Sequence, residues 1–283
     1  MTEVSVAPVI VVFTDLDGTL LDHDTYGWDE ALPALDLCKR LFVPIVLVSS
    51  KTRAEMDPLR LKLSISAPFI SENGGGIFFP GDTAVVPPSD TFLEGDLWKW
   101  SLGLPYAHLI RGLNEIRDEL GWDIKGFSDM SIDDISDLTG LDKKSARLAA
   151  MREFDEPFII LDQDPVDRES LRKAAAQRGL TITEGGRFFH LNGKNDKGQA
   201  MQKLMSLYKR LHGNIVSVAL GDSPNDFSML ECADYPVLVR SRRSFEGLKK
   251  RIPRLMVTSD MGPKGWNTAL LDILDEKEEA DNV

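Results

Sequence analysis

Near its start the chain reads Val9-Ile10-Val11-Val12-Phe13-Thr14-Asp15-Leu16-Asp17-Gly18-Thr19. Residues 9–13 are apolar and mostly β-branched, which predicts a short buried strand of a parallel sheet. Asp15 and Asp17 follow that strand directly, and open α/β sheets place their chemistry at the carboxyl ends of their strands. One carboxylate can attack an electrophile while the other handles a proton or shares a hard cation. The stretch therefore predicts an α/β protein with a carboxylate site at the edge of its sheet.

Buried strands and amphipathic helices alternate on both sides of a long central segment. Further strands are predicted at 45–48, 68–71 and 216–220, and helices at 29–41, 53–63 and 197–211. Strands that alternate with helices indicate a doubly wound, Rossmann-like parallel sheet.

The central segment has a different pattern. Residues 87–90 (Pro-Pro-Ser-Asp) are typical of a linker, and strands at 158–162, 180–184 and 187–191 mix with helices at 106–121, 142–152 and 167–178. We therefore predict a discontinuous α/β core, residues 1–86 and 192–283, that carries an inserted α+β domain, residues 87–191.

Composition narrows the class of protein. The 283 residues carry a formal net charge of −12, so a nucleic-acid partner is not expected. The two cysteines cannot form a disulfide framework and fit a reducing compartment. The sequence shows no secretory signal pattern and no apolar run long enough for a membrane span, so we expect a cytoplasmic monomer or homodimer with no membrane partner.

Polar groups follow three of the predicted strands. The 45–48 strand ends in Ser49-Ser50, and the 216–220 strand ends in Gly221-Asp222-Ser223-Pro224-Asn225-Asp226. The carboxyl ends of parallel strands meet at one edge, where several carboxylates repel one another unless a cation lies among them. Oxygen ligands without His or Cys favour Mg²⁺, so the candidate metal residues are Asp15, Asp17, Asp222 and Asp226. Lys197, which heads a predicted helix, can bridge a carboxylate and a phosphate.

Taken in order, these segments resemble the four motifs of the haloacid dehalogenase-like (HAD) hydrolase superfamily. The matching segments are Asp15-Leu16-Asp17-Gly18-Thr19, Ser49-Ser50, Lys197 and Gly221 to Asp226. The resemblance implies that Asp15 is the nucleophile that becomes an aspartyl-phosphate, and that Asp17 is the general acid and then the base. It also implies phosphate contacts, which we assign to Ser49, Ser50, Lys197 and Asn225, and a large C2-type cap at the inserted domain.

A narrower resemblance points to the mannosyl-3-phosphoglycerate phosphatase family. It rests on the segments 49–53 (SSKTR), 71–74 (SENG), 186–191 (GRFFHL), 196–198 (DKG) and 262–266 (GPKGW). This family removes phosphate from mannosyl-3-phosphoglycerate, and relatives accept the glucosyl compound. The substrate carries a carboxylate and a phosphate, so Arg53, Arg187 and Asn73 are the expected substrate-binding residues. Lys264 departs from the glutamate that many relatives have there, which would change the charge of that loop.

Several alternatives stay open on the sequence alone. The same motifs serve phosphatases of other sugar phosphates and phosphomutases, and a non-catalytic sugar-phosphate sensor is a further possibility. One of Ser49 and Ser50 is expected to be a structural or helix-capping residue. His190 is more typical of a packed histidine than of a catalyst.

Overall fold

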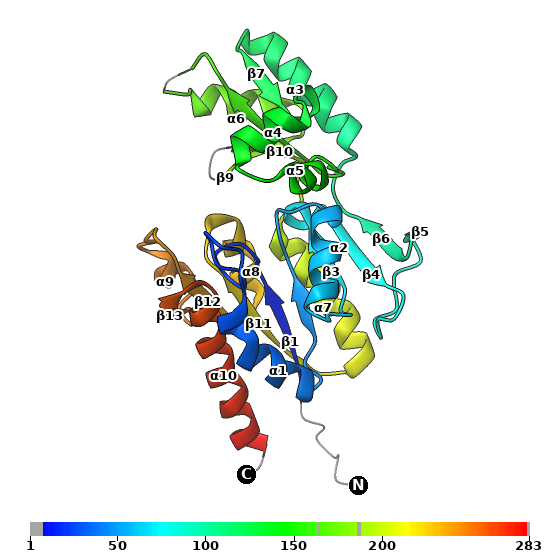
Figure 1. Ribbon diagram of the computed structural model, residues 1–283, viewed down its shortest axis with the longest axis vertical. Coiled ribbons are helices and arrows are strands. Elements are labelled where there is room, and N and C mark those ends of the chain that lie inside the picture. Colours follow the sequence, from blue (N-terminus) through cyan, green and yellow to red (C-terminus); the bar gives the residue numbers. More distant parts are fainter. Residues whose placement is uncertain (1–7, 164, 186–187, 282–283) are drawn as a thin grey trace.

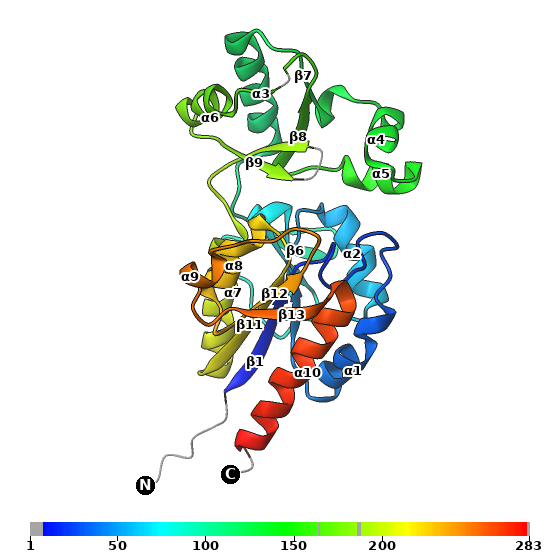
Figure 2. The same ribbon diagram turned by 90° about the vertical axis from the view of Figure 1, so that its left-hand side faces the viewer.

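The computed structural model describes residues 8–163, 165–185 and 188–281. The chain forms a larger lower body and a smaller upper body, shown in two views in Figures 1 and 2. It passes between them in the segment after β6 (Leu97–Ser101) and in the segment after β10 (Phe188–Asn192). Within these residues no helix is long and apolar enough to cross a membrane.

A five-stranded parallel sheet forms the centre of the lower body, in the order β13-β12-β11-β1-β2. Its strands are β1 (Val9–Thr14), β2 (Ile45–Leu47), β11 (Ile215–Gly221), β12 (Tyr235–Arg240) and β13 (Met256–Met261). β1 and β11 lie side by side from the pair Val9–Ile215 to the pair Thr14–Leu220. The strands at 9–13, 45–48 and 216–220 are thus confirmed, and their carboxyl ends share one edge.

Helices cover both faces of this sheet, as a doubly wound fold requires. On one face α1 (Leu32–Arg40) and α10 (Gly262–Asp281) pack against alternate side chains of β1, β11 and β12. On the other face α7 (Lys197–His212) and α8 (Phe227–Cys232) pack against the intervening side chains. The strands are apolar on both faces because both faces are buried.

A second sheet extends the lower body, in the order β3-β4-β6-β5. β3 (Phe69–Ser71) meets the first sheet through one parallel bridge, Val48 to Ile70, but pairs antiparallel with β4 (Gly76–Pro80). β6 and β5 (Phe92–Glu94) then pair with β4 and with each other. Residues 92–101 therefore share a sheet with residues 69–80, while the domain bounds at 87 and 191 stay a prediction.

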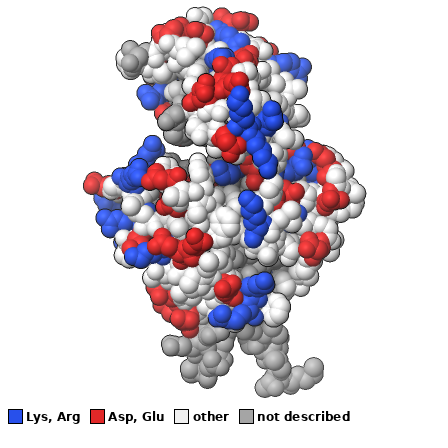
Figure 3. Space-filling view, in the orientation of Figure 1, with Lys and Arg blue, Asp and Glu red and all other residues white. Residues whose placement is uncertain are grey.

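The upper body is built on an antiparallel sheet, in the order β7-β8-β10-β9. The strands β7 (Ile124–Gly126), β8 (Asp155–Ile160) and β9 (Thr181–Gly185) join β10. The helices α3 (Tyr106–Leu120) and α6 (Arg168–Gln177) contribute to its main apolar cluster. The shorter α4 (Ile132–Thr139) and α5 (Lys143–Ala149) pack around Phe127 and Phe188. Acidic and basic side chains are interspersed over the face seen in Figure 3, which is indented between the two bodies.

Candidate active site

Asp15 follows the last residue of β1 and lies at the carboxyl edge of the parallel sheet. Its backbone N–H donates to the carbonyl of Leu220 on β11 at 2.9 Å, so the two central strands fix its position. Thr14 Oγ1 donates to the Asp15 carbonyl at 2.8 Å and accepts from the indole N–H of Trp266 at 2.9 Å. Trp266 is fully buried, so it packs in the core and also holds the backbone that carries Asp15.

Lys197 is the first residue of α7, and Asp196 caps that helix by accepting the N–H of Gln199 at 2.9 Å. The Lys197 ammonium is fully buried and lies 2.6 Å from Asp15 Oδ1 and 2.6 Å from Asp226 Oδ1. Burial lowers the pKa of Lys197, but the charges of the two carboxylates offset this and leave that pKa above its ordinary value. The structure thus holds Lys197 as a fixed cation between two predicted site residues.

The loop after β11 folds around Asp226. Asp226 Oδ2 accepts the N–H groups of Asp222 and Ser223, both at 3.0 Å, and the hydroxyl of Ser223 at 3.1 Å. Gly221 allows this close fold, because a Cβ there would lie only 2.4 Å from the Cβ of Asp226. With Lys197 at Oδ1, four donors meet the two oxygens of Asp226.

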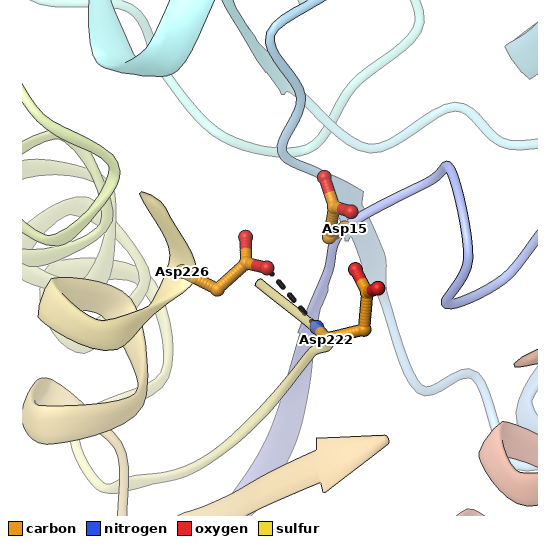
Figure 4. Close-up of side chains that lie close together, drawn as sticks. All are labelled: Asp15, Asp222 and Asp226. Carbon is orange, nitrogen blue, oxygen red and sulfur yellow. Dashed lines mark hydrogen bonds between the residues drawn. The ribbon is translucent and has the colours of Figure 1, made fainter. Parts of the chain in front are cut away.

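The side chains of Asp15, Asp222 and Asp226 lie close together, from the end of β1, the end of β11 and the turn that follows β11 (Figure 4). One oxygen of each lies within 4.8 Å of the others. Burial, followed by the charge of Asp226, raises the pKa of Asp222 to about 6. The same two causes raise the pKa of Asp15 well above its ordinary value, although Lys197 acts in the opposite direction. One ammonium therefore does not balance three carboxylates, and this oxygen-only donor set fits a divalent cation.

Asp17 lies in the turn after β1 and forms an ion pair with Lys51, whose ammonium is 2.9 Å from Asp17 Oδ2. Asp17 Oδ1 is buried and has no hydrogen-bond partner among the described residues. Gly18 adopts a φ of +77°, and a Cβ there would lie 2.9 Å from Asp222 Oδ2, so glycine lets the turn approach the acidic loop. Lys51 was not among the expected site residues, although it directly follows Ser49-Ser50.

The two serines after β2 differ in their surroundings. Ser49 is buried, and its Oγ accepts the N–H of Lys51 at 3.2 Å. Ser50 is half-buried, and its carbonyl accepts a hydrogen bond from Arg152 at 2.9 Å. Neither caps the following helix α2 (Arg53–Lys62), because Thr52 does so through a capping box with Glu55.

Asn73 and Asn225 come from distant segments and meet at the site, where Asn225 Nδ2 donates to Asn73 Oδ1 at 3.0 Å. Asn73 has a φ of 54°, a left-handed conformation that asparagine tolerates better than most residues. Its N–H donates to the carbonyl of Ser49 at 3.0 Å, so this turn also supports residues 49–51, which we call the serine loop.

The sequence singles out three further basic residues: Arg53, Arg187 and Lys264. Arg53 Nε lies 3.0 Å from Glu153, and Arg53 also pairs with Glu94 at 3.2 Å, so acidic side chains already surround it. Arg187 lies outside the described residues. Lys264 pairs with Asp260 at 2.9 Å on the surface, so a neighbouring carboxylate offsets its charge.

Comparison with known proteins agrees with this architecture. The family model for haloacid dehalogenase-like hydrolases matches residues 12–86 and 155–244. A glucosyl-3-phosphoglycerate/mannosyl-3-phosphoglycerate phosphatase from Methanococcoides burtonii is 40% identical over 264 residues, covering 93% of this chain and 97% of its own. A protein of the same name from Persephonella marina is 39% identical over 273 residues, covering 95% and 98%.

A solved structure supports the fold on its own. A crystal structure of a Thermoplasma acidophilum protein superposes with a TM-score of 0.64 at 19% identity, covering 96% of this chain and 99% of that one. The matched stretches include the strands that carry Asp15 and Asp222, and the two relatives span nearly the whole chain. The chain belongs to the haloacid dehalogenase-like hydrolases, in the family of the glucosyl-3-phosphoglycerate/mannosyl-3-phosphoglycerate phosphatases.

Proposed function

We propose that this enzyme is a Mg²⁺-dependent phosphatase that converts mannosyl-3-phosphoglycerate to mannosylglycerate and phosphate. The observation that carries the proposal is the convergence of Asp15, Lys197 and Asp222 at one sheet edge. The chain is also 40% identical to a phosphatase named for both the glucosyl and the mannosyl compound. Glucosyl-3-phosphoglycerate is therefore the second expected substrate. The cytoplasmic location and the monomeric or homodimeric state stay predictions from the sequence.

In the first step the Asp15 carboxylate attacks phosphorus and the bond from phosphorus to the glycerate oxygen breaks. Asp17 gives its proton to that oxygen, which leaves an aspartyl-phosphate on Asp15. Lys197, 2.6 Å from Asp15 Oδ1, holds the nucleophile and offsets charge on the phosphoryl group. Lys51 forms an ion pair with Asp17 Oδ2 in the structure, so this pair opens if the proton is transferred from that oxygen.

In the second step Asp17, now ionised, takes a proton from a water molecule that attacks the aspartyl-phosphate. The bond from phosphorus to the Asp15 oxygen breaks, inorganic phosphate leaves, and both carboxyl groups return to their starting states. General acid–base catalysis of this kind contributes about 10²–10⁴-fold to rate.

The proposed metal residues are Asp15, Asp222 and the backbone carbonyl of Asp17. Asp222 has spare coordinating capacity. Among the residues that the structure describes, its Oδ1 accepts a hydrogen bond only from the Thr19 hydroxyl, at 3.5 Å. Asp226 already meets four donors, so its role is mainly to hold Lys197 and the Asp222 loop. A Mg²⁺ ion held by these residues would offset the charge of the carboxylates and supply Lewis-acid chemistry to a phosphate oxygen.

Ser49 is the proposed serine for phosphate contact, because its oxygen accepts the Lys51 N–H and its own proton stays available to donate. Ser50 takes part through its backbone, and Asn225 and Lys197 complete the phosphate contacts. Arg53, Arg187 and Asn73 stay candidates for the organic part of the substrate. For Arg53 this requires a partial exchange of its present pairing with Glu153 and Glu94.

Phosphate release tests the proposal. Mannosyl-3-phosphoglycerate, glucosyl-3-phosphoglycerate and simple sugar phosphates are compared with Mg²⁺ and with EDTA, with Asp15→Asn as the inactive control. Selective, Mg²⁺-dependent release from a glycosyl-3-phosphoglycerate supports it. Preference for another sugar phosphate would keep the chemistry and reject the substrate, isomer formation without phosphate would indicate a phosphomutase, and no turnover of any ester would favour a sensor.

A further inference from the structure

A strap of residues 148–154, which runs from the last turn of α5 to the start of β8, lies against the core beside the serine loop. The hydroxyl of Thr52 donates to the carbonyl of Leu148 at 2.9 Å. The buried carboxyl group of Glu72 accepts the N–H of Phe154 at 2.8 Å and that of Glu153 at 3.1 Å. Phe154 packs so closely on Gly75 that a Cβ there would lie 2.2 Å from the Phe154 Cβ. The strap is therefore fastened to the core, although it leads into the upper body.

Arg152 is the residue of this strap that reaches the serine loop. Its NH1 group donates to the carbonyl of Ser50 at 2.9 Å, and its Nε donates to the carbonyl of Ala149 at 2.8 Å. The guanidinium also lies 5.7 Å from the centre of the Phe127 ring. Its side chain is only 8% exposed. The guanidinium carries five N–H donors in one plane, and this many fixed partners leave it little freedom to move.

Arg152 forms its ion pair with a residue of the upper body. Asp155, the first residue of β8, is fully buried and lies 3.3 Å from Arg152 NH1. The same Asp155 oxygen lies 2.7 Å from Nδ1 of His190 on β10. Hydrogen bonds therefore run from the sheet of the upper body, through Asp155 and Arg152, to the carbonyl of Ser50.

The Ser50 carbonyl belongs to the peptide unit whose N–H is that of Lys51, and this N–H donates to Ser49 Oγ at 3.2 Å. A donor that fixes the carbonyl thus fixes the N–H that holds the Ser49 hydroxyl. The same peptide plane sets where the Lys51 side chain begins, and Lys51 pairs with Asp17. Burying a guanidinium is costly, and here two carbonyls and one buried carboxylate share its donors.

We propose that Arg152 is a positioning residue for phosphoryl transfer: it orients the Ser50–Lys51 peptide and so aligns the Ser49 hydroxyl and Lys51 with the phosphate. The inference rests on the proposed role of this loop in holding phosphate. It does not depend on which sugar the substrate carries. Loss of such an orienting contact typically reduces activity about 10- to 100-fold.

The test compares Arg152→Met and Arg152→Lys with the matched control Lys99→Met. Lys99 contacts Glu153 of the same strap and Glu94, but not the serine loop. For each protein we would measure kcat and KM for p-nitrophenyl phosphate and for mannosyl-3-phosphoglycerate, the Ki of inorganic phosphate, and the thermal midpoint. p-Nitrophenyl phosphate and inorganic phosphate test the loop without any sugar.

For Arg152→Met we expect kcat to fall about 10- to 100-fold on both esters and the phosphate Ki to rise. Arg152→Lys keeps a charge but loses the planar, forked donor geometry of the guanidinium, so we expect a smaller loss in the same direction. Lys99→Met should lower the thermal midpoint and leave the phosphate Ki within about twofold of the wild type. If Arg152→Met does not fold, Arg152→Lys decides by the same readouts.

Two outcomes would overturn the inference. An unchanged phosphate Ki and unchanged turnover of p-nitrophenyl phosphate would make Arg152 a structural residue only. A loss confined to the glycerate ester would place Arg152 at the leaving group. If the wild type hydrolyses p-nitrophenyl phosphate but neither glycosyl-3-phosphoglycerate, the proposed substrate fails while the test of Arg152 still stands.

Discussion

Replacing Asp222 by asparagine should stabilise the metal-free protein while it abolishes turnover. The pKa of Asp222 rises from 3.8 to about 6 in the folded chain, because burial and the charge of Asp226 disfavour its ionised form. Each pH unit between these values corresponds to about 1.36 kcal/mol, so ionised Asp222 destabilises the fold by up to about 3 kcal/mol. Asp222 is half-buried, and water reduces this figure toward about 1–2 kcal/mol.

The pH window follows from the sign of the shift. Because its pKa is raised, the protonated Asp222 carboxyl group stabilises the folded state fully below about pH 4. This stabilisation of the folded state is lost as the pH rises through about 6. In EDTA at pH 7.5 the Asp222→Asn protein should therefore melt about 2–8 °C above the wild type, and at pH 4 the difference should shrink. Mg²⁺ should raise the midpoint of the wild type, since it binds the folded state, and should raise that of the variant much less.

Differential scanning fluorimetry at both pH values, with and without Mg²⁺, measures all four midpoints. Asp118→Asn, at an exposed position on α3, is the control for removal of one negative charge. A variant that melts at or below the wild type in EDTA at pH 7.5 would refute the idea that uncompensated charge strains the metal-free cluster. Equal Mg²⁺ responses in both proteins would remove Asp222 from the metal site.

Three further changes test other contacts. Lys197→Met leaves carboxylates buried without their cation, so turnover should vanish and the free energy of unfolding should fall by about 3–5 kcal/mol, measured by urea titration; a fall under about 1 kcal/mol would argue against the observed pairing. Trp266→Phe removes the 2.9 Å hydrogen bond to Thr14 and should cost about 1–3 kcal/mol and some kcat, whereas unchanged values would mean that this contact does not hold the nucleophile strand. Burial raises the pKa of Glu72 to about 8, so wild-type stability should fall as the pH rises from about 4.5 to 8, and Glu72→Gln should flatten that slope in melts across this range. An equally steep slope in the variant would assign the pH dependence to other groups.

The sequence allowed the carboxylate site to be predicted because its parts are local signals. Asp15 and Asp222 each follow an apolar strand, and Lys197 follows a helix-capping aspartate. Parallel strands bring their ends to one edge whatever their separation along the chain. The fold class and these three positions therefore follow from short patterns.

Contacts made through side chains across the chain could not be predicted in the same way. The pair of Lys51 with Asp17 and the bond from Arg152 to Ser50 join segments 34 and 102 residues apart, with no local periodicity to mark them. The strand predicted at 68–71 exists, but only one bridge joins it to the parallel sheet. Its antiparallel partner β4 follows a tight turn in which Glu72 and Asn73 both have positive φ, which short apolar runs do not reveal.

The pairing of β1 with β11 has a consequence for how the molecule is made. Val9 lies opposite Ile215, so the nucleophile strand gains that neighbour only after more than two hundred residues have been synthesised. Long-range pairing of this kind slows folding, and an emerging chain exposes the unpaired edge of β1 in the meantime. The antiparallel sheet of the upper body has no such dependence, because all its strands lie between residues 124 and 192. During translation we therefore expect the upper body to fold first and the nucleophile to be assembled last, when the ribosome has released Trp266 and α10 can pack beneath Thr14.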